Sequence, residues 1–323
     1  MNSIKLLTTT AFVSLLAVSS ANAVVVGTHK GYLSVQQVNP AGTTANYLNI
    51  NQNANNKLYL GQDGSNNKAY ATQLSTGNSA AILQVGNSNY AYSRQVGGNG
   101  NYANIEQGEH GIAANNKATI WTDGSANSAD IYTGNAVGNV AGITQGGTKN
   151  TARIYQSEQI DNQNYNSGTI VQKGKYNIAD ITQNGSKNTA AISQANSSNN
   201  ASITQRGISN ISSISQAGSN NFGYIYVDNE HAPVSYNYNR TYITQTGSGN
   251  YAYVAVGGNS NRAIIKQSNG NRAVVDQIGN SNIANITQNG INNNVALSQY
   301  GNGKTYSITQ NGSNIPPVTV VQK

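Results

Sequence analysis

Acidic and histidine side chains are the residues of this sequence whose types could support acid–base or metal chemistry. The 323 residues include 11 Asp and Glu, 3 His and no Cys. Asp228, Glu230 and His231 form the only dense group, and Glu109 and His110 form a smaller one. Glycosidases need two carboxylates held about 5–10 Å apart, and zinc sites need closely spaced ligands. Neither arrangement is evident, so we interpret both groups as solvated loops and expect no catalytic residue, metal or cofactor.

The composition excludes several other classes of protein. Only 9% of residues are charged, and the formal net charge of +7 is spread thinly without a run of Lys or Arg. We therefore expect no nucleic-acid partner. Two Phe and one Trp cannot fill a thick core of large side chains. A thin core of Ile, Ala, Gln and Asn remains open to the chain if every buried amide is paired.

The loop candidates are interruptions in a repeat of about eleven residues. The unit reads aliphatic, small polar, Gln, any, Gly or Asn, any, any, Asn, any, Ala, any, and residues 181–191 are an example. From Val35 the sequence holds 24 such units, and 20 of them carry Gln at the third position. The four exceptions are Thr122, Thr133, Val227 and Val256. A fixed period over nearly the whole chain indicates a stacked repeat and argues against disorder.

Each unit predicts one strand and one turn. Asn188, Ala190, Ile192 and Gln194 alternate with other residues at period two, which is typical of a strand with one buried face. The Gly and Asn positions that follow suit a turn with positive backbone dihedrals. Longer spacings add residues near Pro40 and at 109–114, 157–165 and 228–238, in the turn half. The sequence therefore predicts an all-β fold, a parallel β-solenoid of about twelve two-strand layers with two facing parallel sheets.

Stacking of identical layers would place Gln over Gln and Asn over Asn as side-chain amide ladders. A net hydrogen bond contributes about 0.5–1.5 kcal/mol, whereas an unpaired buried amide costs about 1–3 kcal/mol. A ladder is thus favourable only when the repeat is uniform. The same geometry predicts an outward charge column, because Asp130, Arg153 and Asp180 each precede a strand Ile at intervals of two units.

The N-terminus has the features of an export signal. Lys5, an apolar stretch over residues 6–18 and Ala21-Asn22-Ala23 predict a signal peptide at 1–23. Residues 24–34 do not fit the repeat, so we expect an N-terminal leader or targeting segment there, followed by one repeat domain at 35–323. The ends keep the repeat consensus and show no cap, which predicts strand addition end to end.

The pattern Gln-x-Gly-x-x-Asn-x-Ala-x-x-x-Gln at 183–194, and at 205–216 with Ser212 in place of Ala, resembles the curlin repeat. The resemblance extends over about residues 35–322. It implies a secreted, extracellular subunit of curli-like amyloid fibres at the bacterial cell surface, which serve adhesion and the biofilm matrix. It also implies as partners further copies of the chain, a nucleator, an outer-membrane export pore, and host or abiotic surfaces.

The resemblance also assigns the ladder positions. Those of the curlin family fall on Gln145, Gln183, Gln194, Gln205, Gln216, Gln288, Asn150, Asn188, Asn199, Asn210 and Asn221. The same phase of the repeat adds Gln245, Gln277, Asn250 and Asn282.

The sequence leaves two functions open, a fibre subunit and a carbohydrate-binding solenoid. Outward tyrosines such as Tyr90, Tyr155 and Tyr251 suit either cross-strand packing or stacking on sugars, so the chain could be a solenoid that binds, or less readily cleaves, carbohydrate. An ice-binding solenoid would need flat columns of Thr, whereas the outward positions here are mixed. Fibre growth that depends on concentration and is seeded by preformed fibre would distinguish the fibre subunit from the carbohydrate-binding protein.

Overall fold

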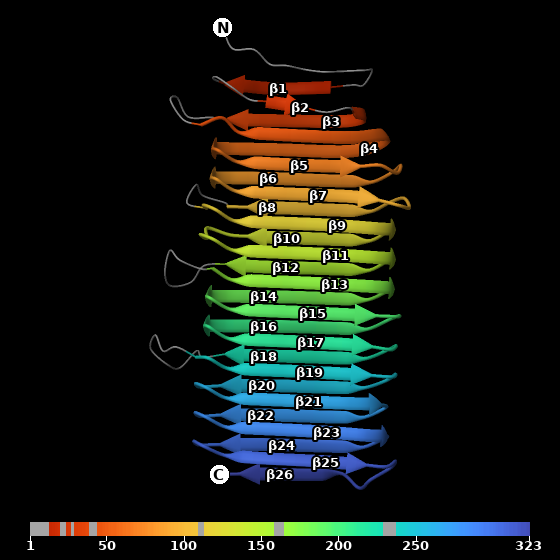
Figure 1. The fold of residues 1–323 in the computed structure, drawn as a ribbon, viewed down its shortest axis with the longest axis vertical. Coiled ribbons are helices and arrows are strands. Elements are labelled where there is room, and N and C mark those ends of the chain that lie inside the picture. Colours follow the sequence, from red (N-terminus) through yellow and green to blue (C-terminus); the bar gives the residue numbers. More distant parts are fainter. Residues whose placement is uncertain are drawn as a thin grey trace. The chain divides into compact units, whose positions relative to one another are not determined.

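The computed structural model describes residues 13–19, 24–26, 29–38, 44–108, 113–157, 165–228 and 237–323. These ranges contain 26 β-strands, labelled in Figure 1, and no α-helix, so nothing in them is a membrane-spanning helix. The chain divides into two compact units, Met1–Tyr165 (unit 1) and Asn166–Lys323 (unit 2).

Unit 1 contains twelve strands, and unit 2 contains fourteen. The strands of unit 1 are β1 (Val13–Ser19), β2 (Val24–Val26), β3 (His29–Val38), β4 (Tyr47–Ser65), β5 (Lys68–Gln73), β6 (Ser79–Asn87), β7 (Tyr90–Val96), β8 (Tyr102–Gln107), β9 (Lys117–Ser125), β10 (Ser128–Thr133), β11 (Val140–Thr148) and β12 (Thr151–Ser157). The strands of unit 2 are β13 (Ser167–Lys175), β14 (Ile178–Ser186), β15 (Thr189–Ala195), β16 (Asn200–Ile208), β17 (Ile211–Ala217), β18 (Phe222–Asp228), β19 (Arg240–Thr246), β20 (Tyr251–Gly257), β21 (Arg262–Asn269), β22 (Arg272–Ile278), β23 (Ile283–Ile291), β24 (Asn294–Tyr300), β25 (Thr305–Asn311) and β26 (Val318–Gln322).

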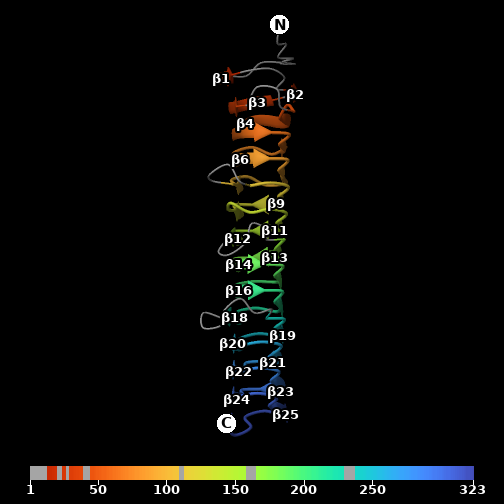
Figure 2. The ribbon, with the colours of Figure 1, turned by 90° about the vertical axis from the view of Figure 1, so that its left-hand side faces the viewer.

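Each unit consists of two parallel sheets between which the chain alternates. In unit 2 the odd-numbered strands β13 to β25 form one sheet and the even-numbered strands β14 to β26 form the other, which Figure 2 separates on two sides. In unit 1, β5, β7, β9 and β11 share one sheet, and β6, β8, β10 and β12 share the other. The predicted all-β parallel solenoid is confirmed, with about twelve turns in the chain.

The period-two pattern of the sequence produces the core. In β15, Ala190, Ile192 and Gln194 are buried while the residues between them face outward. In-register pairing aligns Ile170, Ile192 and Ile214 on successive strands of one sheet. Most strands thus bury one β-branched residue, one small residue and one amide, and the thin core expected from the composition is filled in this way.

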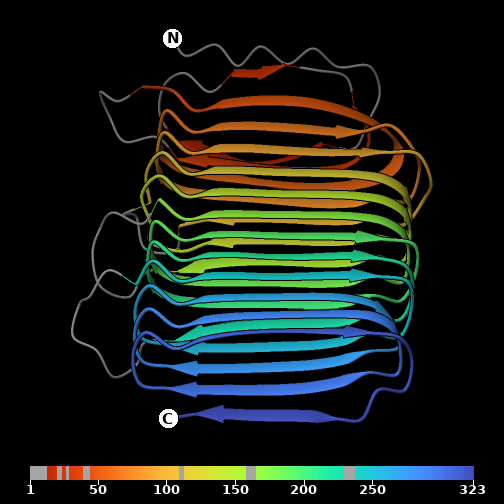
Figure 3. The ribbon, with the colours of Figure 1, turned by 60° about the horizontal axis from the view of Figure 1, so that its bottom comes forward.

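Insertions in the turns leave the register intact. Ile211 of β17 pairs with Arg240 of β19 although 29 positions separate them instead of the usual 22. Residues 229–236 of the predicted insertion at 228–238 lie outside the described residues, as do most of the insertions predicted near Pro40 and at 109–114 and 157–165. Because the insertions fall between strands, the buried faces of the strands that flank them keep their phase. Figure 3 shows the described arcs that connect the two sheets.

The arcs use glycine where the backbone of the next layer approaches closely. Gly185 has φ of +106°, and a Cβ there would collide with the carbonyl oxygen of Gly207 one turn on. The residue before each ladder Asn also has a positive φ even when it is not glycine, as at Lys187 (58°) and Ala126 (54°). The turn prediction from Gly and Asn therefore identified the arcs but not these strained residues.

The N-terminal segments that were set apart on the sequence contain strands. Residues 24–34, expected to form a leader, supply β2 and the first half of β3, and Leu33 is buried. β1 lies within the predicted signal peptide and pairs in parallel with β3. Loss of residues 1–23 would therefore leave β3 without this neighbouring strand.

Candidate assembly site

Buried glutamines form hydrogen-bonded columns inside each unit. In the odd-strand sheet of unit 2 the Nε2 atom of each Gln donates to Oε1 of the Gln one turn further along the chain, at 2.8–3.0 Å. This column consists of Gln172, Gln194, Gln216, Gln245, Gln267, Gln288 and Gln310. In the other sheet Gln183 donates to Gln205 at 3.0 Å. The ladder has one direction, from N-terminal donor to C-terminal acceptor.

The same amides also join the two sheets. Besides its ladder bond, Gln183 donates to the carbonyl oxygen of Ser167 on the facing sheet at 3.1 Å, and Gln194 donates to that of Ile178 at 2.8 Å. Both N–H groups of a buried Gln are thus used. A Gln in this core contributes two hydrogen bonds and leaves no orphaned donor, which is the condition for burying a primary amide.

The asparagine columns use a different chemistry. The backbone N–H of Asn188 donates to Oδ1 of Asn166 at 3.0 Å, and the same bond joins successive asparagines of both columns. The Nδ2 atom of Asn188 then donates to the carbonyl oxygen of Gly207 in the arc of the next turn, at 2.8 Å. Asn therefore holds the arcs in place, so the expected side-chain ladder is partly a side-chain-to-backbone ladder. The predicted positions with this backbone bond are Asn150, Asn188, Asn199, Asn210, Asn221, Asn250 and Asn282.

The glutamine column of the even-strand sheet is interrupted in unit 2. Val227 and Val256 occupy the ladder position in β18 and β20, in register between Gln205 and Gln277. As a result Oε1 of Gln277 is buried without a hydrogen-bond partner, although its Nε2 donates to Gln299 at 2.8 Å.

On the N-terminal side of the interruption, a serine on the facing strand accepts the hydrogen bond that a ladder glutamine would have accepted. Nε2 of Gln205, which has no Gln below it, donates at 2.9 Å to the hydroxyl of Ser212. That hydroxyl is 2.7 Å from Oγ1 of Thr241. Both residues stand where the repeat has Ala. The sequence analysis missed this pair, and the available signal was a polar residue at the Ala position near a valine at the Gln position.

Aromatic side chains accompany the positions that lack Gln. On the outer face of β18 and β20, Phe222 stacks on Tyr251 with ring centroids 5.0 Å apart. Tyr224 stacks on Tyr253 at 5.4 Å. Tyrosine packing across strands thus coincides with the interruption of the amide column inside the same strands.

Unit 1 repeats this association at its own exceptions. Thr122 and Thr133 are buried at ladder positions, and Thr122 is in register with the buried Gln145. The residue before Thr122 is Trp121, which receives the Arg94 guanidinium 4.6 Å from its ring centroid. The residue before Thr133 is Tyr132, which stacks on Tyr155 at 4.7 Å.

The predicted charge column is partly placed. Asp130 and Arg153 are in register on β10 and β12 of unit 1, which puts opposite charges on neighbouring strands. Asp130 also accepts a hydrogen bond from Asn104 at 2.9 Å. Asp180 belongs to unit 2, where it is in register with Ser202.

The acidic and histidine groups considered for chemistry form no site in the described residues. Glu230, His231, Glu109 and His110 lie outside them. Asp228 forms a salt bridge with Arg206 at 3.1 Å and accepts a hydrogen bond from Tyr226. Within the described ranges no three His, Asp or Glu residues come together as metal ligands.

The C-terminal layer of unit 2 ends in open strand edges. β25 pairs with β23 and β26 pairs with β24, and no other described strand covers the far edge of either (Figure 3). The inward residues Tyr306 and Ile308 are correspondingly only half-buried. The ladder still reaches this layer, because Gln299 donates to Gln322 at 2.8 Å.

Sequence comparison agrees with this geometry. The model of the Curlin associated repeat matches residues 76–108, 164–195 and 239–268. No curated protein matches the chain. The matched segments contain the strand, arc and amide positions described above, so the chain contains curlin associated repeats.

Proposed function

We propose that the protein is a secreted structural subunit that assembles end to end into extracellular curli-like amyloid fibres for surface adhesion and the biofilm matrix. The observation that carries this proposal is the in-register stacking of parallel strands and glutamine columns in unit 2, which is the arrangement of cross-β packing. Among the described strands, the far edges of β25 and β26 are unpaired. Unpaired edges of this kind are templates for another chain. The protein acts in this role as a scaffold and not as an enzyme.

The direction of the ladders supports head-to-tail assembly. Each Gln donates toward the C-terminus, so Gln322 and Gln310 present amide donors at the last layer. In β3 and β4 of unit 1, Oε1 of Gln37 and Oε1 of Gln52 are buried without a hydrogen-bond partner. Gln322 already donates one N–H to the Thr305 carbonyl, and Gln310 donates one to that of Pro316. A second copy stacked on β26 would bring the Oε1 acceptors of β3 and β4 to the remaining N–H of each amide. Cleavage of the proposed signal peptide at residues 1–23 would expose β3 for this contact.

Seeded growth of fibres tests the proposal. We expect purified chain to form fibres with a cross-β spacing of about 4.7–4.8 Å and preformed fibre to shorten the lag. Gln322→Lys places a charge on the terminal ladder position and should slow seeded growth about tenfold. Val321→Lys, one residue earlier on the exposed outer face, is the matched control and should grow at the wild-type rate. A wild-type chain that stays monomeric for days, without cross-β diffraction, would refute the assembly proposal.

Export and the further partners are tested in cells. The proposal includes a curli-type nucleator and outer-membrane pore as partners and predicts mature protein that begins at Val24. N-terminal sequencing of protein recovered from the cell surface checks the cleavage site. Full-length chain retained inside the cell in an export-competent host would contradict the secreted location.

A further inference from the structure

Two arginines stand next to each other on the outer face of the odd-strand sheet of unit 2. Arg240 of β19 and Arg262 of β21 are in register, so their Cα atoms are about 4.8 Å apart across the sheet. Like charges placed directly opposite each other on neighbouring strands are destabilising. Neither guanidinium forms a salt bridge with a described residue, and Arg262 has one long hydrogen bond, 3.4 Å to Asn285. The pair therefore has an unbalanced positive charge.

The sheet that carries this pair has no acidic residue to compensate it. Strands β13, β15, β17, β19, β21, β23 and β25 contain no Asp or Glu, although they also carry Lys173, Lys175 and Lys266. The acidic residues of the described strands of unit 2 lie on the even-strand sheet instead, at Asp180, Asp228 and Asp276. The positive potential above Arg240 and Arg262 is thus not reduced by a neighbour on their own face.

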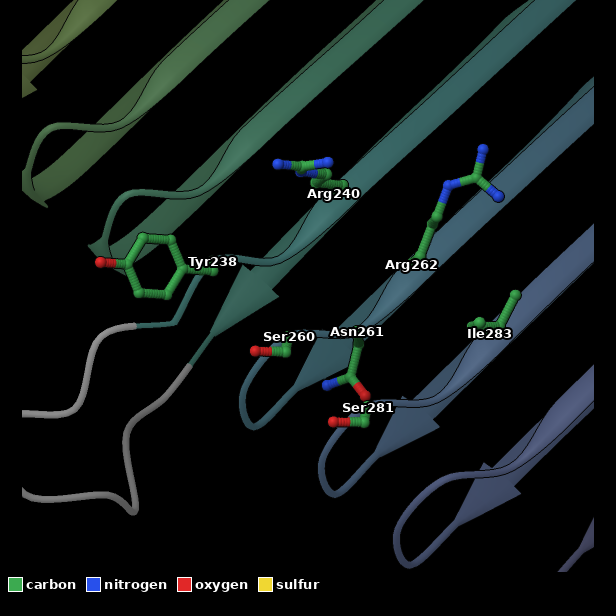
Figure 4. Close-up of a pocket in the computed structure, with 7 residues that line it drawn as sticks. All are labelled: Tyr238, Arg240, Ser260, Asn261, Arg262, Ser281 and Ile283. Atoms are coloured by element: carbon green, nitrogen blue, oxygen red, sulfur yellow. The ribbon is translucent and has the colours of Figure 1, made fainter.

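The arginines line a surface pocket together with hydroxyl groups. Its lining residues are Tyr238, Arg240, Ser260, Asn261, Arg262, Ser281 and Ile283 (Figure 4). Ser260 and Ser281 occupy equivalent places on successive arcs, with φ of 57° and 59°. No described residue hydrogen-bonds to either hydroxyl. Two cationic forks and two free hydroxyl donors therefore border one open hollow.

We propose that this pocket binds an oxyanion, a sulfate, phosphate or carboxylate group that is free or carried on an acidic polymer. A guanidinium presents a planar fork of N–H donors that matches two oxygens of such a group, and charge-assisted bonds of this kind are about twice as strong as neutral ones. The anion bridges Arg240 and Arg262 and removes their mutual repulsion, and Ser260 and Ser281 donate to its remaining oxygens. All of these residues belong to one unit of one chain, so the site does not depend on fibre formation.

Equilibrium binding to the soluble full-length chain tests the site, with fluorescently labelled dextran sulfate as the probe. The Arg240→Gln/Arg262→Gln double variant should bind the probe at least tenfold more weakly. The Lys187→Gln/Arg272→Gln double variant loses the same two charges at exposed positions outside the pocket, and it should stay within twofold of wild type. Equal weakening in both variants would show a general charge effect and overturn the proposal. Unchanged binding in the first variant would overturn it as well.

Competition experiments identify the ligand, and a charge-conserving variant tests the site in case the Gln variant does not fold. Inorganic sulfate should displace the probe at an ionic strength at which chloride does not, and neutral labelled dextran should not bind. Displacement by both salts alike, or binding of neutral dextran, would contradict an oxyanion site. Direct saturable binding of sulfate supports a site for a free anion, and at least tenfold tighter binding of the polymer supports an acidic chain. Arg240→Lys/Arg262→Lys keeps the charge but not the forks, and we expect about threefold weaker binding even if the Gln variant fails to fold.

Discussion

The two sheets of unit 2 reach similar order by different means. The odd-strand sheet has an unbroken column of seven glutamines from Gln172 to Gln310 and an outer face without acidic residues. The even-strand sheet has valines in the column at β18 and β20, and on its outer face aromatic rings stack over the same two strands. Successive layers are thus joined by a buried amide ladder in the odd-strand sheet, and by stacked aromatic rings on the outer face where the even-strand sheet lacks glutamine.

The magnitudes of the two interactions explain why one can replace the other. A buried hydrogen bond contributes about 0.5–1.5 kcal/mol net, and a stacked aromatic pair contributes about 0.5–1.5 kcal/mol beyond its buried area. Replacing glutamine by valine is without cost only if the glutamines that flank the valines keep a partner for every buried amide group. Ser212 meets this condition on one side of the interruption, and Gln277, with its unpartnered Oε1, shows that the other side does not meet it.

The largest expected effect comes from breaking the intact column. Gln288→Leu would remove the acceptor of Gln267, the donor to Gln310 and the donor to the Arg272 carbonyl. At about 1–3 kcal/mol for each of these three orphaned buried groups, we expect the free energy of unfolding to fall by about 3–9 kcal/mol. Urea unfolding of the soluble full-length chain measures the change.

The matched variant in the interrupted column is Gln277→Leu. It orphans the acceptor of Gln299 and the carbonyl of Arg262 but removes the Oε1 that is already unpaired. We expect it to cost about 1–3 kcal/mol less than Gln288→Leu. Equal losses in the two variants would show that the columns are equivalent and that the orphaned oxygen has no energetic consequence.

Next in size is the loss of the boundary serine. Ser212→Ala leaves one N–H of Gln205 without its acceptor and Thr241 without its hydroxyl partner, so we expect a loss of about 1–3 kcal/mol. Ser215→Ala changes an exposed serine of the same strand and should stay within about 0.5 kcal/mol. Hydrogen exchange at β16 and β17 would locate the change. If the two alanine variants show equal hydrogen-exchange rates at β16 and β17, Ser212 does not compensate for Val227.

A smaller effect is expected from the aromatic ladder. Tyr253→Ser removes the stacking of Tyr253 on Tyr224, and we expect the loss of about 0.5–1.5 kcal/mol of stacking. Tyr242→Ser, on the outer face of the other sheet, removes a half-buried tyrosine that has no ring partner among the described residues. A double-mutant cycle between Tyr224 and Tyr253 measures the pair directly. A coupling energy of zero would mean that the rings only cover the sheet.

The fold was predictable because the repeat constrains it at every position. Ile at the first place, Ala at the tenth and Gln at the third alternate inward with period two, and one register satisfies all 24 units. Insertions did not obscure this pattern, because they fall in arcs such as the one between β18 and β19. Because the chain returns to the same sheet after every two strands and in the same direction, strands two apart in the sequence must pair in parallel.

The features that the sequence did not reveal depend on contacts between different layers. The replacement of a ladder bond by Ser212 needs the knowledge that residue 212 faces residue 205 across the core. The bond from the Asn188 backbone to the Asn166 side chain needs Asn as the acceptor, but its donor is a backbone N–H that the arc conformation positions. The arginine pair follows from the same two-unit spacing, since 22 positions separate Arg240 from Arg262, but the hollow that it lines with Ser260 and Ser281 becomes evident only in the structure. The repeat predicts columns, whereas exceptions to the repeat acquire partners only in three dimensions.

The smallest effect concerns the acidic residue on the interrupted sheet. Burial raises the pKa of Asp276 above its ordinary value of 3.8, although a hydrogen bond from Tyr300 opposes the shift. The native state therefore keeps the proton at pH values where the unfolded chain has released it. It follows that the free energy of unfolding falls as pH rises from about 3.8 to the raised pKa and then stays level. Asp276→Asn should remove this decline, which urea unfolding across pH 3–7 would measure. The prediction is contradicted if the free energy of unfolding of the wild type minus that of the variant stays constant or rises with pH.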